Sequence, residues 1–461
     1  MSALDQTVLN TAIPKISIVL DDVNRAPWII TSYLLFATFA TPVAGKLADI
    51  FGVKPMLTVS SLMFAATSAL CGVSGFINLP GFPGAAGATF GAMDQLIVFR
   101  GLQGIAGGAM MALCFVAIGD LMPSRDRGKF QGVLAADFMI AAIIGPMLGG
   151  WLTDKVDWRW IFYLNIPVGV LAALIFVLLY PESKREKAKP EIDWPGIGLF
   201  ILAVAPLLLL SNEIGTQGQF TMNSAMEIIV SISSMRLFIA REKSAEEPLI
   251  PLALFENRIV SISLVTVFIT GIGFFGSMLL MAMVLQQVYK LTATMSGAVL
   301  APLMLVVASA SIVGGLLISK TGKYRALIIL SLVLMTLGTL ILSTVSPDAP
   351  MWVVPCSGIV GGIGLGLMLP VHSIIIQNAV QGSSMGIATS LSSLFRSLGG
   401  TIGTGMMGAL LVWLQHNGHE HSQLPIALML YAASLVLAIV LNIFLPEIEL
   451  KSSSQKATAN A

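Results

Sequence analysis

Long apolar runs recur along this chain, and they limit its possible folds more than any other feature. The run at residues 133–152 (VLAADFMIAAIIGPMLGGWL) has about the length of a helix that crosses a lipid bilayer. Runs of this kind, this one included, lie at 1–20, 27–48, 56–77, 95–119, 131–153, 160–181, 195–211, 223–240, 259–285, 297–318, 326–346, 352–378, 386–414 and 424–445. In lipid, backbone polar groups need partners inside the protein, and a helix supplies them. We therefore predict an all-α integral membrane protein with about 14 transmembrane helices.

The composition excludes several classes of protein. Only 11% of the 461 residues are charged, against about 25% in a soluble protein. A net charge of +1 favours no polyanionic partner, which argues against nucleic-acid binding. The three cysteines form neither a disulfide framework nor a metal-ligand pattern, and no phosphate-binding loop predicts ATP-driven pumping. An enzyme would need clustered histidines or carboxylates within the spans, where His372 stands alone, so we expect no enzyme and no cofactor.

Basic residues predict the orientation in the membrane. Most of the 25 Lys and Arg residues lie in alternate loops, and they lie on the cytoplasmic side if both termini are cytoplasmic. The first run is short, because Asp5 and Lys15 bracket its apolar part. Either the first helix is cut short or the true start of the protein lies upstream of Met1, and we expect the second.

Two segments of the chain repeat each other. Residues 45–54 (GKLADIFGVK) follow the second run, and residues 315–323 (GLLISKTGK) follow the tenth, with glycines at the same spacing. Two related halves are typical of secondary transporters. We predict an N-terminal six-helix bundle over 1–181, a linker with two extra spans over 182–258, a C-terminal six-helix bundle over 259–445 and a cytoplasmic tail over 446–461.

Charged residues inside the runs are candidates for chemistry, because a charge at mid-membrane costs roughly 2.5–3.5 kcal/mol and usually faces the bundle interior. Asp5, Arg100 and Asp137 are the main candidates for a proton-coupling or substrate pathway. Simpler roles stay open for each of them. Asp5 could bond to Asn10 or to the chain end, Arg100 could be a structural partner of an acid, and Asp137 could reach the inner surface. Glu227 and Arg236 lie near the ends of a weak span and are expected at the membrane interface. Arg396 is given no specific role, and Glu213 is expected in an outer loop.

A gate and a flexible helix are also predicted. Asp49, between Gly45 and Gly52, could pair with Arg125 or Arg127 across two cytoplasmic loops and lock one conformation; the alternative is a set of solvated loops. In the fifth run, Gly145, Pro146, Gly149 and Gly150 place small residues and a helix breaker in mid-helix. Such residues survive in lipid where neighbouring helices pack against them, so this helix is expected to pack closely and to bend.

A cluster of potential metal ligands lies near the end of the chain. His416, His419, Glu420 and His421 occupy the last outer loop. Without a rigid scaffold this cluster is read as an ordinary loop, so no metal site is predicted.

Several segments match motifs that occur together in one transporter family. They are residues 4–14, 45–54, 100–108, 145–150, 158–167, 285–288, 377–380 and 395–400. Together they resemble the major facilitator superfamily, and within it the fourteen-span drug:proton antiporters of the EmrB/QacA type. Two departures are visible: Ile50 and Val53 stand where the loop motif prefers basic residues, and Asp137 stands where the branch usually has an apolar residue.

The resemblance implies export of lipophilic, often cationic, drug-like compounds in exchange for protons by alternating access. It also implies that Asp5 and Arg100 line the coupling or substrate pathway, and that Asp49 and Arg125 or Arg127 belong to the gate. An exporter dedicated to one metabolite, lipid or antibiotic is the main alternative, and a non-transporting membrane sensor is a further one. The expected partners are small molecules, protons and membrane lipid. We expect a monomer in the cell (inner or plasma) membrane. The sequence makes no prediction for or against a periplasmic adaptor protein.

Overall fold

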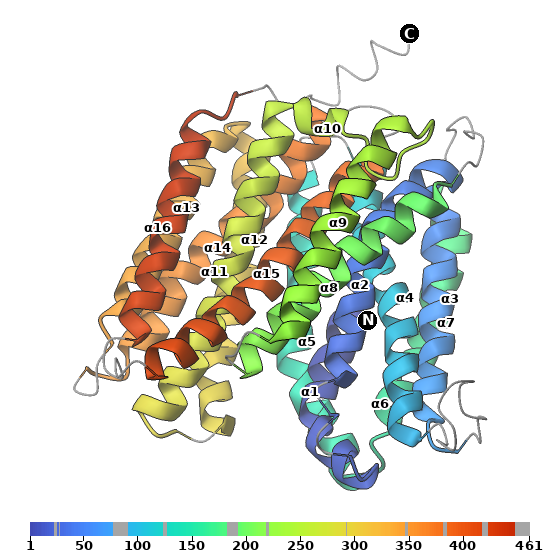
Figure 1. Cartoon of the computed structure of the whole chain (residues 1–461), viewed down its shortest axis with the longest axis horizontal. Coiled ribbons are helices and arrows are strands. Elements are labelled where there is room, and N and C mark those ends of the chain that lie inside the picture. Colours follow the sequence, from blue (N-terminus) through green and yellow to red (C-terminus); the bar gives the residue numbers. More distant parts are fainter. Residues whose placement is uncertain are drawn as a thin grey trace. The chain divides into compact units, whose positions relative to one another are not determined.

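The computed structural model of the chain is drawn in Figure 1. It describes residues 1–22, 25–26, 28–76, 91–122, 127–181, 192–217, 221–291, 293–345, 349–380, 385–416 and 423–447. All regular elements within these residues are helices, which confirms the predicted all-α class. The contacts divide the chain into two compact units. The N-terminal unit comprises Met1–Val116 and Asp137–Pro190, and the C-terminal unit comprises Ala117–Ala136 and Glu191–Ala461.

The N-terminal unit is a bundle of helices packed through small residues. Its helices are α1 (Ser2–Val19), α2 (Trp28–Phe51), α3 (Val53–Gly72), α4 (Ala92–Leu121), α5 (Arg127–Lys155), α6 (Trp160–Tyr163) and α7 (Asn165–Leu179), of which α4 and α5 extend past its boundaries. Helix α3 lies along α7, and its Gly72 faces the ring of Tyr163. Because helices gain no hydrophobic drive to associate in lipid, close approach at glycines is what provides packing energy.

The C-terminal unit holds the remaining helices. They are α8 (Trp194–Gln217), α9 (Met222–Ser244), α10 (Ala253–Glu256), α11 (Arg258–Met283), a π-helical turn (Val284–Val288), α12 (Ala293–Thr321), α13 (Tyr324–Ser343), α14 (Val353–Ala379), α15 (Met385–His416) and α16 (Gln423–Ile443). Helix α14 packs against α12 and α13, and α13 also packs against α16, its neighbour in Figure 1. Helix α11 packs against α15.

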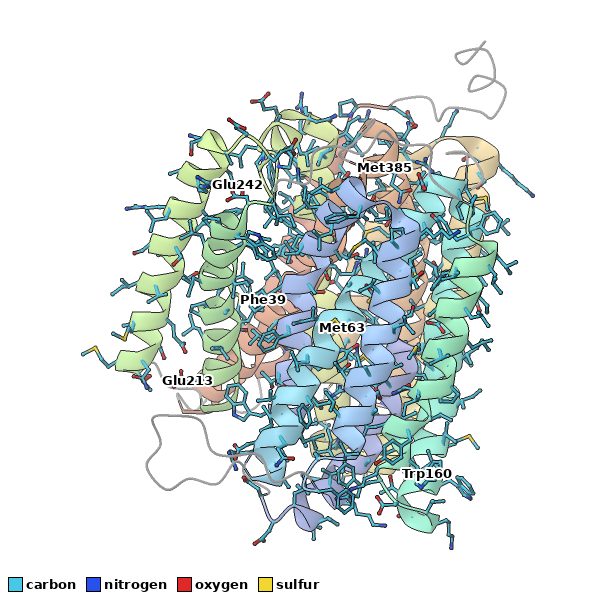
Figure 2. All side chains as sticks on the ribbon, turned by 90° about the vertical axis from the view of Figure 1, so that its right-hand side faces the viewer. Phe39, Met63, Trp160, Glu213, Glu242 and Met385 are labelled. Carbon is cyan, nitrogen blue, oxygen red and sulfur yellow. The ribbon has the colours of Figure 1, made fainter. Side chains whose placement is uncertain are left out.

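Helices α8 and α9 form an antiparallel pair, and α8 packs against α15. Ser231 of α9 donates a hydrogen bond to the carbonyl of Ala203 on α8, and Asp193 pairs with Arg241 at 3.0 Å beside the start of α8. Figure 2 shows Glu242 and Glu213 at opposite ends of the pair. The prediction that Glu213 lies in a loop is wrong: it lies within α8, because the helix continues through polar residues after the apolar run ends.

Eleven of the described helices are long and apolar enough to cross a membrane, counting α6 and α7 as one. Helices α1, α5 and α15 are not among these eleven. The structure therefore supports a multi-pass membrane protein but does not establish the predicted number of 14 spans. Many side chains on the outer faces of the spans are large and apolar, such as Leu179 and Met222.

The repeated segments have the same backbone feature. Gly52 connects α2 to α3 with a φ of 93°, and Gly322 lies between α12 and α13 with a φ of 68°. A positive φ is easy for glycine and costs other residues about 1–2 kcal/mol. The shared spacing of the glycines thus reflects one helix–turn–helix geometry that occurs in both halves of the chain.

We expect Gly52→Ala to lower the melting temperature of the purified protein, because alanine must adopt a strained φ there, although its Cβ atom would make only an ordinary contact with Pro55 at 3.8 Å. Gly297→Ala is the matched control: Gly297 lies in helical backbone of α12 with open space at its Cβ position, so alanine should be neutral or slightly stabilising. Thermal unfolding in detergent measures both. Equal melting temperatures for the two variants would contradict this account of Gly52.

Candidate functional site

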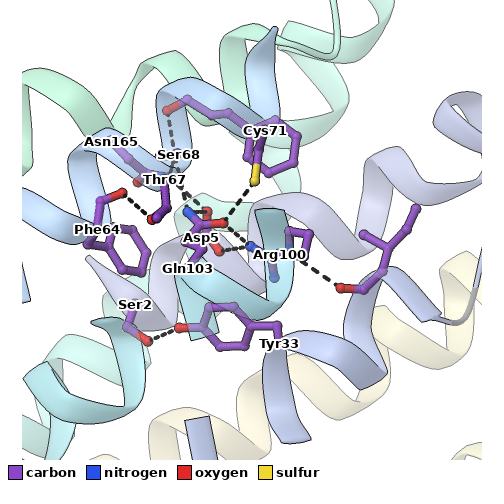
Figure 3. Close-up of polar contacts among 12 residues, drawn as sticks. Ser2, Asp5, Tyr33, Phe64, Thr67, Ser68, Cys71, Arg100, Gln103 and Asn165 are labelled. Atoms are coloured by element: carbon purple, nitrogen blue, oxygen red, sulfur yellow. Dashed lines mark hydrogen bonds and ion pairs between the residues drawn. The ribbon is translucent and has the colours of Figure 1, made fainter. Parts of the chain in front are cut away.

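Asp5 and Arg100 form an ion pair inside the N-terminal unit (Figure 3). Asp5 lies in the first turn of α1 and Arg100 lies in α4. Their closest atoms, Oδ2 and Nη1, are 2.7 Å apart, and the two side chains are at most 1% exposed. Removing one member of such a pair typically costs about 3–5 kcal/mol, because the other charge is left buried without a partner. The pair therefore ties α1 to α4.

Two amide side chains complete the contacts of the Asp5 carboxylate. Asn165, the first residue of α7, donates to Oδ1 at 2.7 Å, and Gln103 of α4 donates to the same oxygen at 3.2 Å. Both amides also donate to the hydroxyl of Ser68 at 3.1 Å. Ser68 lies in α3 and donates in turn to the carbonyl of Phe162. The site is thus a connected polar network that joins four helices within an apolar bundle.

Arg100 is held on its remaining sides as well. Its Nε donates to the carbonyl of Ile29 at 3.3 Å, and Nη1 donates to Gln103 Oε1 at 2.5 Å. The guanidinium carbon lies 4.3 Å from the centre of the Tyr33 ring, which is a favourable position for a cation over an aromatic face. The Tyr33 hydroxyl shares a hydrogen bond with Ser2. An ammonium group could not satisfy this planar set of partners, so the site requires arginine.

Glycines of α4 allow this network to close. A Cβ atom at Gly104 would lie 2.3 Å from the carbonyl oxygen of Tyr33, and one at Gly108 would lie 2.2 Å from that of Ala37. A Cβ atom at Gly107 would lie 2.0 Å from the Tyr33 hydroxyl oxygen. These glycines bring α4 against α2, and they place Tyr33 over Arg100. The glycines of the 100–108 motif are therefore explained by packing, and its arginine by the ion pair.

The predicted small-residue motif of α5 performs a similar packing role toward α1. A Cβ atom at Gly145 would lie 2.0 Å from Thr7 Oγ1, and Thr7 donates a hydrogen bond to the carbonyl of Ala141 at 2.9 Å. Gly149 is buried, whereas a Cβ atom at Gly150 would meet nothing within 4 Å. The helix is continuous through Pro146, whose side chain lies outside the described residues. Close packing is confirmed at Gly145, which lies against Thr7, two residues along α1 from Asp5. Bending of α5 stays a prediction.

Asp137 does not join the ion pair and does not point into the bundle. Its side chain is exposed on α5, on a stripe that it shares with Ile140, Ile144 and Met147 at helical spacing. The expectation that it faces the interior of its bundle is therefore wrong for this structure. Of the remaining charged candidates, Arg236 is exposed, and Glu227 and Arg396 are partly buried.

The predicted gate residues are described only in part. In the N-terminal unit Gly45 is buried, Asp49 is partly buried, and Gly52 makes the turn after α2. Arg125 lies outside the described residues. Arg127 is buried in the C-terminal unit, where it donates to the carbonyls of Met122 and Gly119 at 3.0 and 2.7 Å and lies 4.0 Å from Met385 Sδ. The Asp49–arginine pairing stays a prediction. The loop holding most of the C-terminal histidine cluster also lies outside the described residues.

The two charges could be predicted from the sequence, but the roles of the amides could not. Gln103 lies within the 100–108 motif and Asn165 within the 158–167 motif, whereas Ser68 and Tyr33 lie in apolar runs without a motif. The available signal was an amide inside a span, since a buried polar group in lipid needs a partner. Only the packing of α3, α4 and α7 shows which carboxylate accepts the hydrogen bonds of the two amides.

We expect Gly145→Ala to impair the protein and Gly150→Ala to leave it unchanged, although both glycines belong to one motif. The first substitution pushes a methyl group into Thr7 and shifts α1, at a cost of about 1–3 kcal/mol. The second meets open space. Melting temperature and membrane yield measure both variants, and a harmful Gly150→Ala with a harmless Gly145→Ala would contradict the α1–α5 contact.

Comparison with known proteins agrees with this architecture. The chain is 35% identical over 411 residues to the multidrug transporter protein MdtP of Bacillus subtilis, covering 89% of this chain and 73% of that protein. It is 31% identical over 415 residues to multidrug resistance protein 3 of the same organism, covering 89% and 77%. The structure of the proton:xylose symporter XylE of E. coli aligns over 99% of this chain and 96% of that chain, with a TM-score of 0.67 and 16% identity. That likeness concerns the fold alone.

The sequence profile of the Major Facilitator Superfamily matches residues 1–404, which is most of the chain. The helical bundles, the relatives and the profile agree with one another, and they identify a transporter, not an enzyme. The chain belongs to the major facilitator superfamily of membrane transporters.

Proposed function

We propose that this chain is a proton-coupled exporter of lipophilic, often cationic, compounds in the cell membrane. The buried Asp5–Arg100 pair is the observation that carries the proposal. An acid that is fully enclosed and bound by three donors is an expensive feature, and within membranes such features usually serve proton or ion pathways. The names of the two Bacillus subtilis relatives support multidrug compounds as the substrate class.

Coupling follows from the charge balance of the pair. When Asp5 binds a proton, its charge is lost and Arg100 is left as a buried cation without a counter-ion. Such a state is costly enough to shift a two-state equilibrium, because each 1.4 kcal/mol changes an equilibrium constant tenfold. Protonation would therefore favour a second conformation in which Arg100 reaches water or another partner. Release of the proton there would restore the paired state and complete alternating access.

Asp137 is the acid that we propose for binding the substrate. It is exposed in α5 among apolar side chains, where a lipophilic cation could find both a carboxylate and an apolar surface. Ile140 and Ile144 lie one and two turns further along the same stripe. The two acids would then have separate tasks, with Asp5 carrying the proton and Asp137 attracting the cation.

The cytoplasmic gate is proposed to include the end of α4. Arg127 donates to two carbonyls near the C-terminal end of α4, where helices leave such groups unpaired, and it contacts Met385 at the start of α15. A contact of this kind can break without unfolding a helix. Asp49 and Arg125 would complete the gate, and the small residues of α5 would allow that helix to bend while it opens.

The proposed topology has 14 spans, with both termini in the cytoplasm. Helices α1, α5 and α15 have 18, 29 and 32 residues, which at 1.5 Å per residue reach or exceed most of a hydrocarbon core of about 30 Å. Adding them to the eleven apolar helices gives two bundles of six with α8 and α9 inserted between them in sequence. A monomer would suffice for transport, because each chain supplies both halves.

The test is uptake of a fluorescent lipophilic cation into inside-out vesicles with an acidic lumen. We expect gradient-driven uptake by the unchanged protein, and loss to the level of empty vesicles in Asp5→Asn. Asp137→Asn should raise the concentration of dye needed for half-maximal uptake, because it removes only the attraction for the cation. Asp154→Asn, an exposed acid of the same helix, is the matched control and should transport normally.

Folding and function are separated by a double variant. Asp5→Asn leaves Arg100 unpaired and could reduce the yield, whereas Asp5→Asn combined with Arg100→Gln removes both charges and should fold better. This double variant should still fail to couple uptake to the proton gradient. Coupled uptake in the double variant would contradict the assignment of Asp5. If no dye moves with a well-folded unchanged protein, the alternative of an exporter for one dedicated compound replaces the multidrug proposal.

A further inference from the structure

The C-terminal unit contains a cavity of about 60 Å³ that neither the ion pair nor the gate uses. Helices α11, α12, α13, α14 and α16 line it, and the polar part of its surface is small. Four methionines, Met278, Met281, Met304 and Met335, and the ring of Phe274 supply much of the lining. The volume is several times the roughly 10–15 Å³ that one water molecule needs, and it suits a ring-sized apolar group.

Two hydroxyl groups at this cavity have no hydrogen-bond partner. Tyr431 of α16 is 3% exposed, and its hydroxyl is buried and unpaired, as is the hydroxyl of Ser277 on α11. The other two hydroxyls in the lining are paired: Thr339 donates to the carbonyl of Met335, and Ser357 donates to that of Val354. A buried polar group without a hydrogen-bond partner is unfavourable, so these two hydroxyls stand out from their neighbours.

Backbone packing fixes the position of the tyrosine. A Cβ atom at Gly273 would lie 1.3 Å from the Tyr431 ring, so the hydroxyl end of the ring packs against bare backbone of α11. This contact leaves the ring no room to turn toward α11. Tyr431 is thus held in the lining of the cavity, which has the form of an apolar pocket with a few fixed polar groups.

We propose that this cavity is a second ligand site, which binds a neutral lipophilic molecule through an apolar ring and a hydrogen-bond acceptor. The acceptor, such as a ketone or sulfone oxygen, receives hydrogen bonds from Tyr431 and Ser277. The described residues of the lining include no charged side chain, so a neutral ligand fits better than an ion. Methionine side chains are flexible and polarizable, which lets the four of them adapt to rings of different shape.

This site differs from the proposed transport chemistry in place and in ligand. The Asp5–Arg100 pair belongs to the N-terminal unit, whereas all residues of the cavity belong to the C-terminal unit. Binding here needs neither a proton gradient nor transport. The inference can therefore fail or succeed independently of the proposed function.

Benzophenone is a suitable probe, because it is a neutral diaryl ketone that labels methionine when illuminated. The excited ketone takes a hydrogen atom from a methionine C–H bond, and the two radicals join in a new C–C bond while the ketone becomes an alcohol. Purified full-length protein would be illuminated with increasing benzophenone, and labelled methionines would be located by peptide mass spectrometry. We expect saturable labelling of Met278, Met281, Met304 or Met335. Exposed methionines such as Met222 and Met406 should label in proportion to concentration, without saturation.

Two competitors test the role of the acceptor. Diphenyl sulfone has a similar shape and retains an acceptor, whereas diphenylmethane has none. Diphenyl sulfone should suppress labelling of the cavity methionines at about a tenfold lower concentration than diphenylmethane, which is the effect of roughly one hydrogen bond. Equal potency of the two would contradict the assigned role of the hydroxyls.

Two variants test the place of binding. Gly361→Val fills the cavity, and its Cβ atom is tolerated because the nearest atom would be 3.9 Å away; it should abolish saturable labelling. Tyr431→Phe should weaken competition by diphenyl sulfone about tenfold without lowering the melting temperature, since it removes an unpaired hydroxyl. Gly297→Val and Tyr289→Phe, which lie outside the cavity, are the matched controls. Saturable labelling that survives Gly361→Val in folded protein would overturn the proposal.

Discussion

Burial of one guanidinium group is the constraint on which the N-terminal unit depends. Arg100 is 1% exposed in a largely apolar helix, and leaving that charge buried without a partner would cost about 3–5 kcal/mol. Its partner must come from another helix, which fixes α1 through Asp5. The second carboxylate oxygen then needs donors, which Asn165 and Gln103 supply. One charge thus determines how α1, α4 and α7 are placed.

Glycine provides the close approach that this arrangement needs. The small residues of α4 admit Tyr33 over the guanidinium, and Gly145 of α5 admits Thr7 of α1. The same device occurs in the C-terminal unit, where Gly273 receives the Tyr431 ring, but there it supports an apolar cavity instead of an ion pair. The two units therefore use similar backbone packing to build different chemistry. This contrast favours separate sites for the proton and for a neutral ligand.

The helices, the repeat and the two charges of the candidate pair could be predicted, because each corresponds to a local pattern in the sequence. Apolar runs mark spans, glycines of equal spacing mark repeated turns, and a charge within a run marks a buried site. Other features depend on tertiary packing. Asp137 looked like Asp5 in sequence, yet only the rotation of α5 makes it exposed. The roles of Ser68 and Tyr431 could not be predicted from the sequence, and neither could the end of α8 at Gln217, beyond its apolar run. No local sequence pattern records which groups a side chain contacts across a helix interface.

Difference infrared spectroscopy shows whether Asp5 exchanges its proton during transport. Purified protein in lipid would be brought to mildly acidic pH and mixed with tetraphenylphosphonium, a lipophilic cation. We predict that the carbonyl band of a protonated carboxylic acid decreases when the cation binds, and that this change is absent in Asp5→Asn but present in Asp154→Asn. A band change that persists in Asp5→Asn would assign the proton to another acid and contradict the account.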